Sequence, residues 1–181
     1  MKNDSMFKFS VTSKTDNTAM LKKAMDTLAK RIVVVGYPED KNVTRSAAFS
    51  GIGPAPSARI TNASLAYIQD KGSPAAGIPP RPFLEPGVDA VSTKIEKRLA
   101  QGARAALGGD EDAVDKSLSQ AGLTAQAGVR AFITNGNFQA LKASTLAARR
   151  RGRFKGTKPL IVTGQLRNAV NYTIRNRSGG L

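Results

Sequence analysis

The sequence predicts an α+β fold, with a small antiparallel or mixed sheet packed with long helices and extended loops between them. Two long segments repeat apolar residues at helical spacing. Two short segments, 32–35 and 171–175, are rich in β-branched or aromatic residues and have the composition of strands. Seventeen glycines and nine prolines in 181 residues leave much of the rest irregular. At this length we expect one α+β domain spanning residues 1–181.

The first predicted elements are a helix over 15–31 and a strand over 32–35. Thr15 or Asp16 can cap the helix. Its apolar residues fall on one face at helical spacing: Met20, Leu21, Ala24, Met25 and Leu28. The β-branched run that follows ends at Gly36 and predicts a strand that is covered on both faces or central in a small sheet.

Residues 38–60 show no apolar period, because prolines, glycines and serines interrupt every repeat. A stretch of this length without regular structure predicts a long flexible loop. A short helix over 62–71 follows and ends at Gly72, a residue type that suits a helix C-terminus. The residues expected on its inner face are Leu65, Ala66 and Ile68.

The segment 77–84 contains Pro79, Pro80 and Pro82, which remove three backbone donors and fix φ. It therefore predicts a stiff, extended corner. A long helix is predicted after it, ending at Gly108. The apolar stripe of that helix is Leu84, Val88, Val91, Ile95 and Leu99.

A second long helix is predicted to begin at Asp110 or Asp112, where an acidic first turn complements the helix dipole. Its apolar residues again fall on one face: Val114, Leu118, Ala121, Ala125, Val129 and Phe132. Its N-terminal carboxylates do not follow the spacing of a calcium loop, so we expect no metal site there. Those carboxylates belong to Asp110, Glu111, Asp112 and Asp115.

The last third of the chain combines basic and irregular segments with a short strand. A basic loop is predicted over 142–158, where arginines and lysines are dense and apolar anchors are scattered. After it, Thr163 can cap one or two helical turns within 165–170, and the alternation of 171–175 predicts a strand.

Charge is the strongest compositional signal. The chain has 28 Lys and Arg against 13 Asp and Glu, and every acidic residue lies at or before Asp115. From Lys116 onward there are 12 basic residues and no acidic ones. A positive field concentrated in one third of a chain favours binding to polyanions or to an acidic protein surface. A solvated basic tail that keeps the protein soluble has the same composition.

The residue types that are missing exclude several kinds of site. The chain has no cysteine and no histidine, which removes disulfides, the usual zinc sites and histidine-based acid–base or nucleophilic catalysis. An enzyme that uses only carboxylates or lysine remains an alternative, but no motif supports one, and we expect no enzymatic activity, no metal and no cofactor. No apolar run approaches the roughly 20 residues that cross a bilayer, and the polar first ten residues lack the pattern of a signal peptide. We expect no membrane partner.

The proline corner and the turn around Gly164 are candidates for contact with other subunits. Each predicts either a structural bend or a preformed edge against which a neighbouring subunit packs. The candidate interface residues are Arg81, Pro82, Phe83, Leu84, Thr163, Leu166 and Arg167.

The basic run predicts a solvated loop, a contact with the DNA backbone, or a contact with an acidic partner. Its candidate residues are Arg149, Arg150, Arg151, Arg153 and Lys155. Since Phe154 is the one aromatic residue nearby, we expect no base stacking or sequence reading.

Three motifs occur in a fixed order along the chain. They are Ala-Tyr-Ile at 66–68 before Gly72, Ile-Pro-Pro-Arg-Pro-Phe-Leu at 78–84, and Lys-Pro-Leu-Ile-Val-Thr-Gly-Gln-Leu-Arg at 158–167. This set resembles the tail-completion and neck (head–tail joining) proteins of tailed phages, including Mu-like virion morphogenesis proteins. The chain departs from them at Val162, where that family more often has Asp.

The resemblance implies a structural virion protein that closes into a ring with copies of itself, a hexamer being the expected form, and joins the tail to the head–tail connector. Its implied partners are other neck, connector and tail proteins, with packaged DNA as a non-specific contact. Its implied location is the neck or tail region of the virion, and the host cytoplasm before assembly. The alternative is a nucleic-acid-binding protein that acts through its basic C-terminal third.

Overall fold

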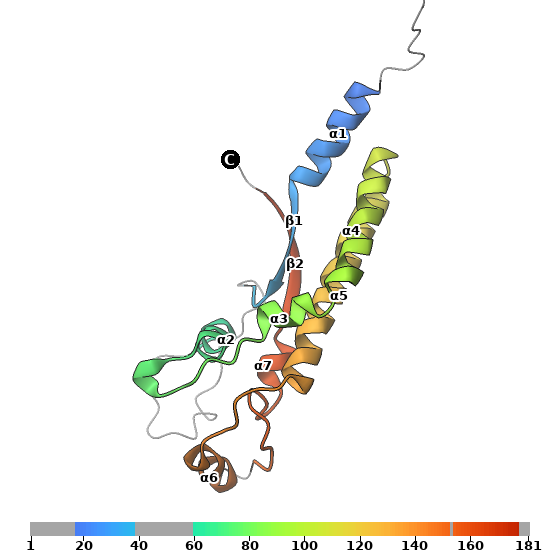
Figure 1. Cartoon of the computed structure of the whole chain (residues 1–181). Helices are drawn as coiled ribbons and strands as arrows, with labels where there is room; N and C mark the ends of the chain where they lie inside the picture. Colours follow the sequence, from blue (N-terminus) through green and yellow to red (C-terminus); the bar gives the residue numbers. More distant parts are fainter. Residues whose placement is uncertain (1–16, 39–59, 153, 178–181) are drawn as a thin grey trace, which may run out of the picture.

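The computed structural model describes residues 17–38, 60–152 and 154–177. These residues form an elongated molecule with a long helical hairpin along one side and a β-ribbon beside it (Figure 1). The hairpin consists of α4 (Ser92–Leu107) and α5 (Glu111–Asn135). The ribbon is a two-stranded antiparallel sheet of β1 (Arg31–Gly36) and β2 (Asn171–Asn176). The predicted α+β class, a small sheet packed on helices, is confirmed.

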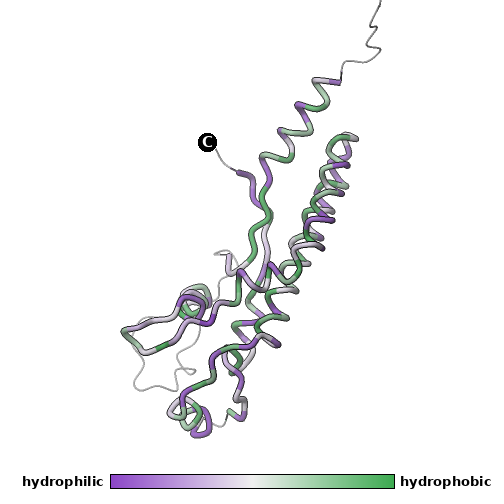
Figure 2. Tube along the Cα trace, in the orientation of Figure 1, coloured by the Kyte–Doolittle hydropathy of each residue, from purple (hydrophilic) through white to green (hydrophobic). Residues whose placement is uncertain are grey.

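The ribbon pairs a strand near the beginning of the described chain with a strand near its end. Arg31 pairs with Asn176 at one end of its register and Gly36 pairs with Asn171 at the other. β1 is one of the most hydrophobic stretches of the chain (Figure 2). Ile32 and Val34, however, remain 39% and 36% exposed, while the alternate residues pack inward. The prediction of a strand covered on both faces is therefore wrong, because helices pack against one face of the sheet and Ile32 and Val34 remain exposed on the other.

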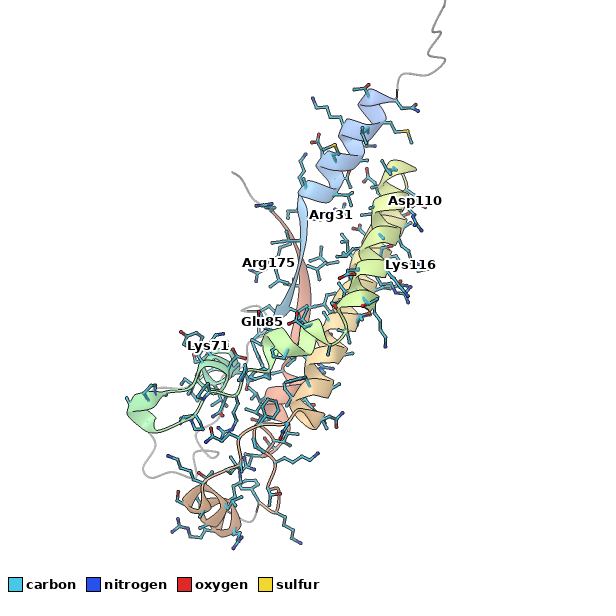
Figure 3. All side chains as sticks on the ribbon, viewed as in Figure 1. Arg31, Lys71, Glu85, Asp110, Lys116 and Arg175 are labelled. Atoms are coloured by element: carbon cyan, nitrogen blue, oxygen red, sulfur yellow. The ribbon has the colours of Figure 1, made fainter. Side chains whose placement is uncertain are left out.

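α5 begins directly after Asp110, the residue that caps its N-terminus. The side chain of Asp110 accepts a hydrogen bond from the Ala113 amide at 2.9 Å, and Glu111 and Asp112 occupy the first turn. The predicted apolar face is buried up to Val129, after which Ile133 is buried and Phe132 only partly so. Asp110 marks the tip of the hairpin, which lies beside α1 and is labelled in Figure 3.

The single long helix predicted from Leu84 is wrong, because the structure has two. α3 (Leu84–Asp89) and α4 are separated at Ala90 and Val91, where Val91 leaves helical geometry with φ −124° and ψ 11°. α3 crosses α5 so closely that a Cβ on Gly87 would lie 2.7 Å from the Cα of Val129. The break redirects the chain from this crossing into the α4–α5 hairpin.

The apolar stripe expected for the undivided helix is only partly buried. Leu99 is 42% exposed, and the buried positions of α4 are the small residues Gly102 and Ala106. Small residues allow the two helix backbones to approach, since a Cβ on Gly102 would lie 3.1 Å from the Cβ of Ser117.

Two apolar cores hold these elements together. We call the first the elbow core: Ala66, Phe83, Val129, Ile133, Leu160, Leu166 and Val170. We call the second the hairpin core: Ala24, Ala106, Val114 and Leu118. Tyr37 links the ribbon to the elbow core, since its ring packs edge-on against Phe83 at a centroid distance of 6.5 Å and its hydroxyl donates to the Leu166 carbonyl at 2.9 Å.

The remaining elements surround these cores. α1 (Thr18–Ala29) lies at the hairpin-tip end, whereas α2 (Asn62–Lys71) and α6 (Ala143–Arg151) lie toward the opposite end (Figure 1). A 3-10 turn, η3 (Pro74–Ala76), and the short helix α7 (Gln165–Asn168) complete the set.

Several loop and cap predictions change in the structure. The basic loop predicted over 142–158 contains α6, so about half of it is helical. Thr15, Asp16 and residues 39–59 of the predicted flexible loop lie outside the described residues. α7 begins after Gly164, whose φ is 78°, and the Thr163 hydroxyl accepts only a long 3.5 Å contact from the Gln165 amide.

Candidate functional site

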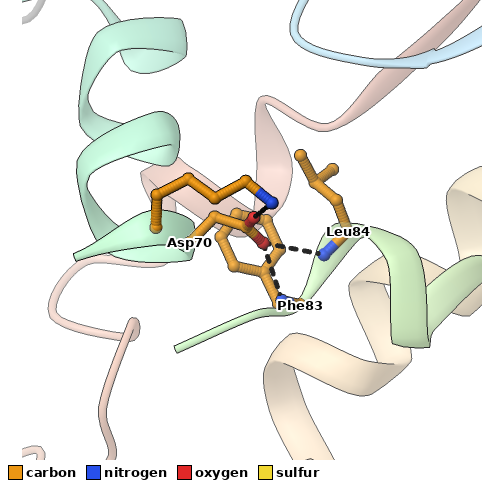
Figure 4. A network of polar contacts seen from close by, with 4 residues as sticks. Asp70, Phe83 and Leu84 are labelled. Carbon is orange, nitrogen blue, oxygen red and sulfur yellow. Dashed lines mark hydrogen bonds and ion pairs between the residues drawn. The ribbon is translucent and has the colours of Figure 1, made fainter. Parts of the chain in front are cut away.

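The proline corner is held in place by a buried carboxylate on α2. Oδ1 of Asp70 accepts hydrogen bonds from the amides of Phe83 at 2.9 Å and Leu84 at 3.3 Å, and Oδ2 lies 3.1 Å from Nζ of Lys71 (Figure 4). Leu84 is the first residue of α3, so Asp70 satisfies donors at the start of a helix that has no side-chain cap of its own.

Asp70 is 6% exposed and remains charged. Burial alone would raise the pKa of its carboxyl, but hydrogen bonds from Phe83, Lys71 and Leu84 outweigh burial and hold that pKa below 3.8. Sequence analysis missed this residue. The sequence did contain one indication of its role. Asp70 lies in the last turn of α2, where the helix dipole disfavours a negative charge, so its carboxylate must be stabilised by groups from outside that helix.

Three of the seven predicted interface residues, Arg81, Phe83 and Leu166, are buried inside the chain. Phe83 is 0% exposed and Leu166 is 3% exposed, and both belong to the elbow core. Neither has surface left for a neighbouring subunit, so their prediction as interface anchors is wrong and the structural reading of the corner holds for them. The other predicted members keep some surface: Pro82 and Thr163 are exposed, and Leu84 and Arg167 are half-buried.

Arg81 is the charged member of this corner, and it is 5% exposed. Its backbone amide donates to the Gln69 carbonyl at 2.9 Å, and its side-chain Nε donates to the Gln139 carbonyl at 3.1 Å. Burial lowers the pKa of its guanidinium. Arg81 thus connects α2 to the segment that precedes α6.

The basic run divides into one internal residue and several external ones. Nη1 of Arg149 donates to three carbonyls of the loop after α6, those of Gly156 at 2.8 Å, Lys158 at 2.9 Å and Ile161 at 3.2 Å. Arg149 therefore holds this loop, and its prediction as a free DNA contact is not supported by its position.

Arg150, Arg151 and Lys155 are exposed, and we call these three the basic face. Arg153 lies outside the described residues.

Other cations of the last third also bond to backbone carbonyls. Nη2 of Arg130 donates to the carbonyls of Asn168 and Val170 at 3.0 and 2.8 Å. Nζ of Lys142 donates to Gly77, and Nζ of Lys158 donates to Thr134. These charges are stabilised by carbonyl dipoles, so part of the basic composition has a structural use.

The acidic cluster of the α5 N-terminus also has structural partners. Glu111 lies 3.5 Å from Nζ of Lys23 on α1, and Asp115 pairs with Arg31 of β1. Together with the cap at Asp110, these contacts explain the cluster without a cation. Among the described residues, no three carboxylate, histidine or cysteine side chains are grouped as metal ligands.

α1 presents most of its apolar side chains to solvent. Met20, Leu21 and Met25 are 46%, 49% and 62% exposed, and we call them the α1 apolar face. Ala24 is the one residue of this helix that is buried, in the hairpin core. Met20 also borders a small hollow between α1 and the hairpin tip, with Ala106 and Glu111 across from it. The helical spacing of these apolar residues was predicted, and the structure places most of them at the surface.

No helix in the described part of the chain has the length and hydrophobicity required to span a bilayer. Comparison with models of known families, with curated proteins and with solved structures gives no match to this chain. The likeness of its three motifs to phage tail-completion proteins therefore stays a prediction from the sequence.

Proposed function

We propose that this chain is a non-enzymatic structural subunit of a tailed-phage neck, which completes the tail by forming a ring with copies of itself against the connector. The α1 apolar face is the observation that carries the proposal. Three large apolar side chains on one short helix, each about half exposed, indicate a surface that another protein covers. The three ordered motifs of the sequence, which resemble those of phage tail-completion proteins, are the reason for proposing a tailed-phage particle.

The rest of the structure suits a subunit whose function is geometric. The proline corner is fixed by Asp70, and the loop after α6 is fixed by Arg149, so both keep a defined shape. The exposed Ile32 and Val34 of β1 add a second apolar strip on the ribbon. A rigid subunit with separate apolar surfaces can contact two neighbours, as a head-to-tail ring requires.

The α1 apolar face can be tested by substitution and mass measurement. We expect the wild-type chain to form a closed oligomer, a hexamer in the simplest case, by light scattering after size-exclusion chromatography. The Leu21→Gln/Met25→Gln variant should shift toward monomer without loss of folding cooperativity. Leu123→Gln on α5, also at an exposed position (54%), is the matched control and should assemble as wild type does.

Particle composition tests the proposal directly. Mass spectrometry of purified virions should find this chain at a small symmetric copy number. Virions that lack the chain, and particles that mature normally without its gene, would contradict the neck assignment.

A second candidate function is non-specific binding to a polyanion through the basic face. Its support is the exposure of Arg150, Arg151 and Lys155 in a region with no carboxylates. Phosphate contacts release counterions, so binding should weaken linearly with the logarithm of salt concentration, with a slope of about −0.9 for each contact. A gel-shift titration with duplex DNA measures this slope.

The matched control for the DNA titration removes three charges elsewhere. Replacing the basic face with three glutamines should abolish the shift and flatten its salt dependence. The same replacement of the exposed Lys94, Lys97 and Arg98 on α4 should not. Equal effects of the two variants would show that only net charge matters.

A further inference from the structure

The outer face of the β-ribbon combines apolar and cationic side chains. Ile32 pairs with Arg175 across the ribbon, and Val34 follows two residues later on β1, so these three side chains lie on one face. The pair between them, Val33 and Ile174, packs on the opposite face against the hairpin core. Figure 3 shows Arg175 on the side of the ribbon away from the hairpin. We call Ile32, Val34 and Arg175 the ribbon face.

The ribbon is also cationic at its end nearest α1. The Arg177 amide donates to the Lys30 carbonyl at 2.6 Å, and both residues line an open cleft of about 500 Å³ beside α1. The charged lining of this cleft consists of four cations and two carboxylates: Lys23, Lys30, Arg31, Arg177, Asp26 and Glu111. The three ion pairs among the described residues use neither Arg175 nor Arg177. The ribbon therefore presents positive charge that an acidic surface can pair.

The hairpin tip has the complementary composition. Leu107 ends α4 and is 49% exposed, and Asp112 is exposed in the first turn of α5. Met20 of α1, 46% exposed, borders the same hollow as Ala106 and Glu111, so the α1 apolar face reaches this tip. Asp112 takes part in none of the three ion pairs that the described residues form. We call Met20, Leu107 and Asp112 the tip surface.

We infer that the tip surface of one copy docks on the ribbon face of the next copy in the ring. Asp112 of one copy pairs with Arg175 of its neighbour, and the apolar residues of the two surfaces cover each other. The inference rests on the proposed function and deepens it, because it makes the two exposed apolar surfaces the two sides of a single interface.

Charge and direction favour this occupant over the alternatives. The ribbon face lies away from the hairpin of its own chain, so a neighbouring copy must supply the tip (Figure 3). Two ribbon faces, or two tip surfaces, would place like charges opposite each other, which disfavours symmetric pairing. A DNA backbone can pair with Arg175 but leaves Ile32 and Val34 uncovered. Contact between two different surfaces is the heterologous arrangement that closes into a ring.

Charge reversal on either side tests the contact. Arg175→Glu and Asp112→Lys, each made alone in the full chain, should raise about tenfold the concentration at which half of the chains are assembled, because each places like charges opposite each other. The double variant restores an opposite pair and should assemble as wild type does. Light scattering across a dilution series measures the midpoint.

Mixing the two single variants gives a sharper readout. In an equimolar mixture, Asp112 of one variant meets Arg175 of the other, and Lys at 112 meets Glu at 175. Rings should therefore form again with the two variants alternating. Such a ring closes only with an even number of copies, equally divided between the variants, and native mass spectrometry counts both.

The controls make the same charge changes at exposed positions elsewhere. Lys94→Glu on α4 and Asp89→Lys on α3 should assemble as wild type does. Circular dichroism of each variant confirms that it is folded. Rings that form equally well in Arg175→Glu or Asp112→Lys overturn the inference. Failure of both the double variant and the mixture to assemble also overturns it, in favour of a different acidic occupant of the ribbon face.

Two outcomes separate this inference from the proposed function. Rings of wild-type chain that ignore both charge reversals contradict only the tip-to-ribbon contact. Rings that are lost and rescued as expected, from a chain that is absent from virions, contradict only the neck assignment. A wild-type chain that stays monomeric at every concentration contradicts both.

Discussion

Asp70 accepts the backbone amide of Phe83 at 2.9 Å, across thirteen residues and a proline corner. The bond joins the last turn of α2 to the largest buried side chain of the elbow core. Because the same oxygen also accepts the Leu84 amide, a single carboxylate fixes where the corner ends and where α3 begins. The corner's shape thus depends on one charge as well as on its prolines.

We predict that Asp70→Ala lowers the free energy of unfolding by about 3 kcal/mol, because it leaves two backbone donors without their charged acceptor. Urea denaturation at pH 7, followed by circular dichroism, measures the loss. Asp89→Ala, an exposed acid at the far end of α3, is the control and should stay within about 0.5 kcal/mol of wild type. A loss as large in the control would assign the effect to net charge.

Stability should depend on pH through Asp70. Its folded-state pKa lies below the ordinary value of 3.8, so the unfolded state binds the proton more readily and the carboxylate stabilises the fold above that value. The contribution should shrink as the pH falls below 3.8 toward the folded-state pKa. The difference between the urea midpoints of wild type and Asp70→Asn, measured from pH 7 down to pH 2.5, should therefore narrow below pH 3.8. A difference that is constant across this range would contradict the assignment.

The crossing of α3 and α5 should not tolerate a methyl group. A Cβ on Gly87 would lie 2.7 Å from the Cα of Val129, which is backbone and cannot rotate away. We expect Gly87→Ala to destabilise the protein by about 1–3 kcal/mol. Gly108→Ala is the control: its nearest neighbour lies 3.4 Å away and its φ is −82°, so its stability should hold. Equal thermal midpoints for the two variants would refute the close packing.

Arg149 and Arg150 are adjacent but should behave differently. Arg149→Met removes three hydrogen bonds to the loop after α6, so amide exchange in residues 154–162 should accelerate by about tenfold, which corresponds to about 1.4 kcal/mol of local stability. Arg150→Met removes an exposed charge and should leave exchange unchanged. Hydrogen exchange with mass spectrometry, together with tryptic cleavage after Lys155, compares the two.

Local chemistry predicted much of the fold. The short helix 62–71 has the predicted bounds, and the strand at 171–175 and the helix start near Asp110 are also present. Each depends on neighbours in sequence: a glycine after a helix, alternating residues in a strand, or a carboxylate that caps a helix three residues away. Such signals can be recognised without knowing the tertiary structure.

Features that depend on contacts between distant parts of the chain were predicted less well. A β-branched run has the same composition whether one or both of its faces are covered, so the exposure of Ile32 and Val34 could not be foreseen. α6 was predicted as loop because it has no apolar stripe, although alanine and arginine favour helices. The contacts of Asp70 and Arg149 with backbone atoms depend on the path of the loops, and no spacing rule gives that path.

The β-ribbon has a consequence for how the molecule is made. β1 pairs with β2, which lies about 140 residues later in the sequence. The pairing of Arg31 with Asn176 therefore cannot form until β2 has been synthesised. The α4–α5 hairpin closes through neighbours in sequence and can form while translation continues, whereas the ribbon has a very high contact order. We therefore expect the sheet to be the last of these elements to form. Until then, the hydrophobic strand β1 is open to aggregation and can be bound by a chaperone.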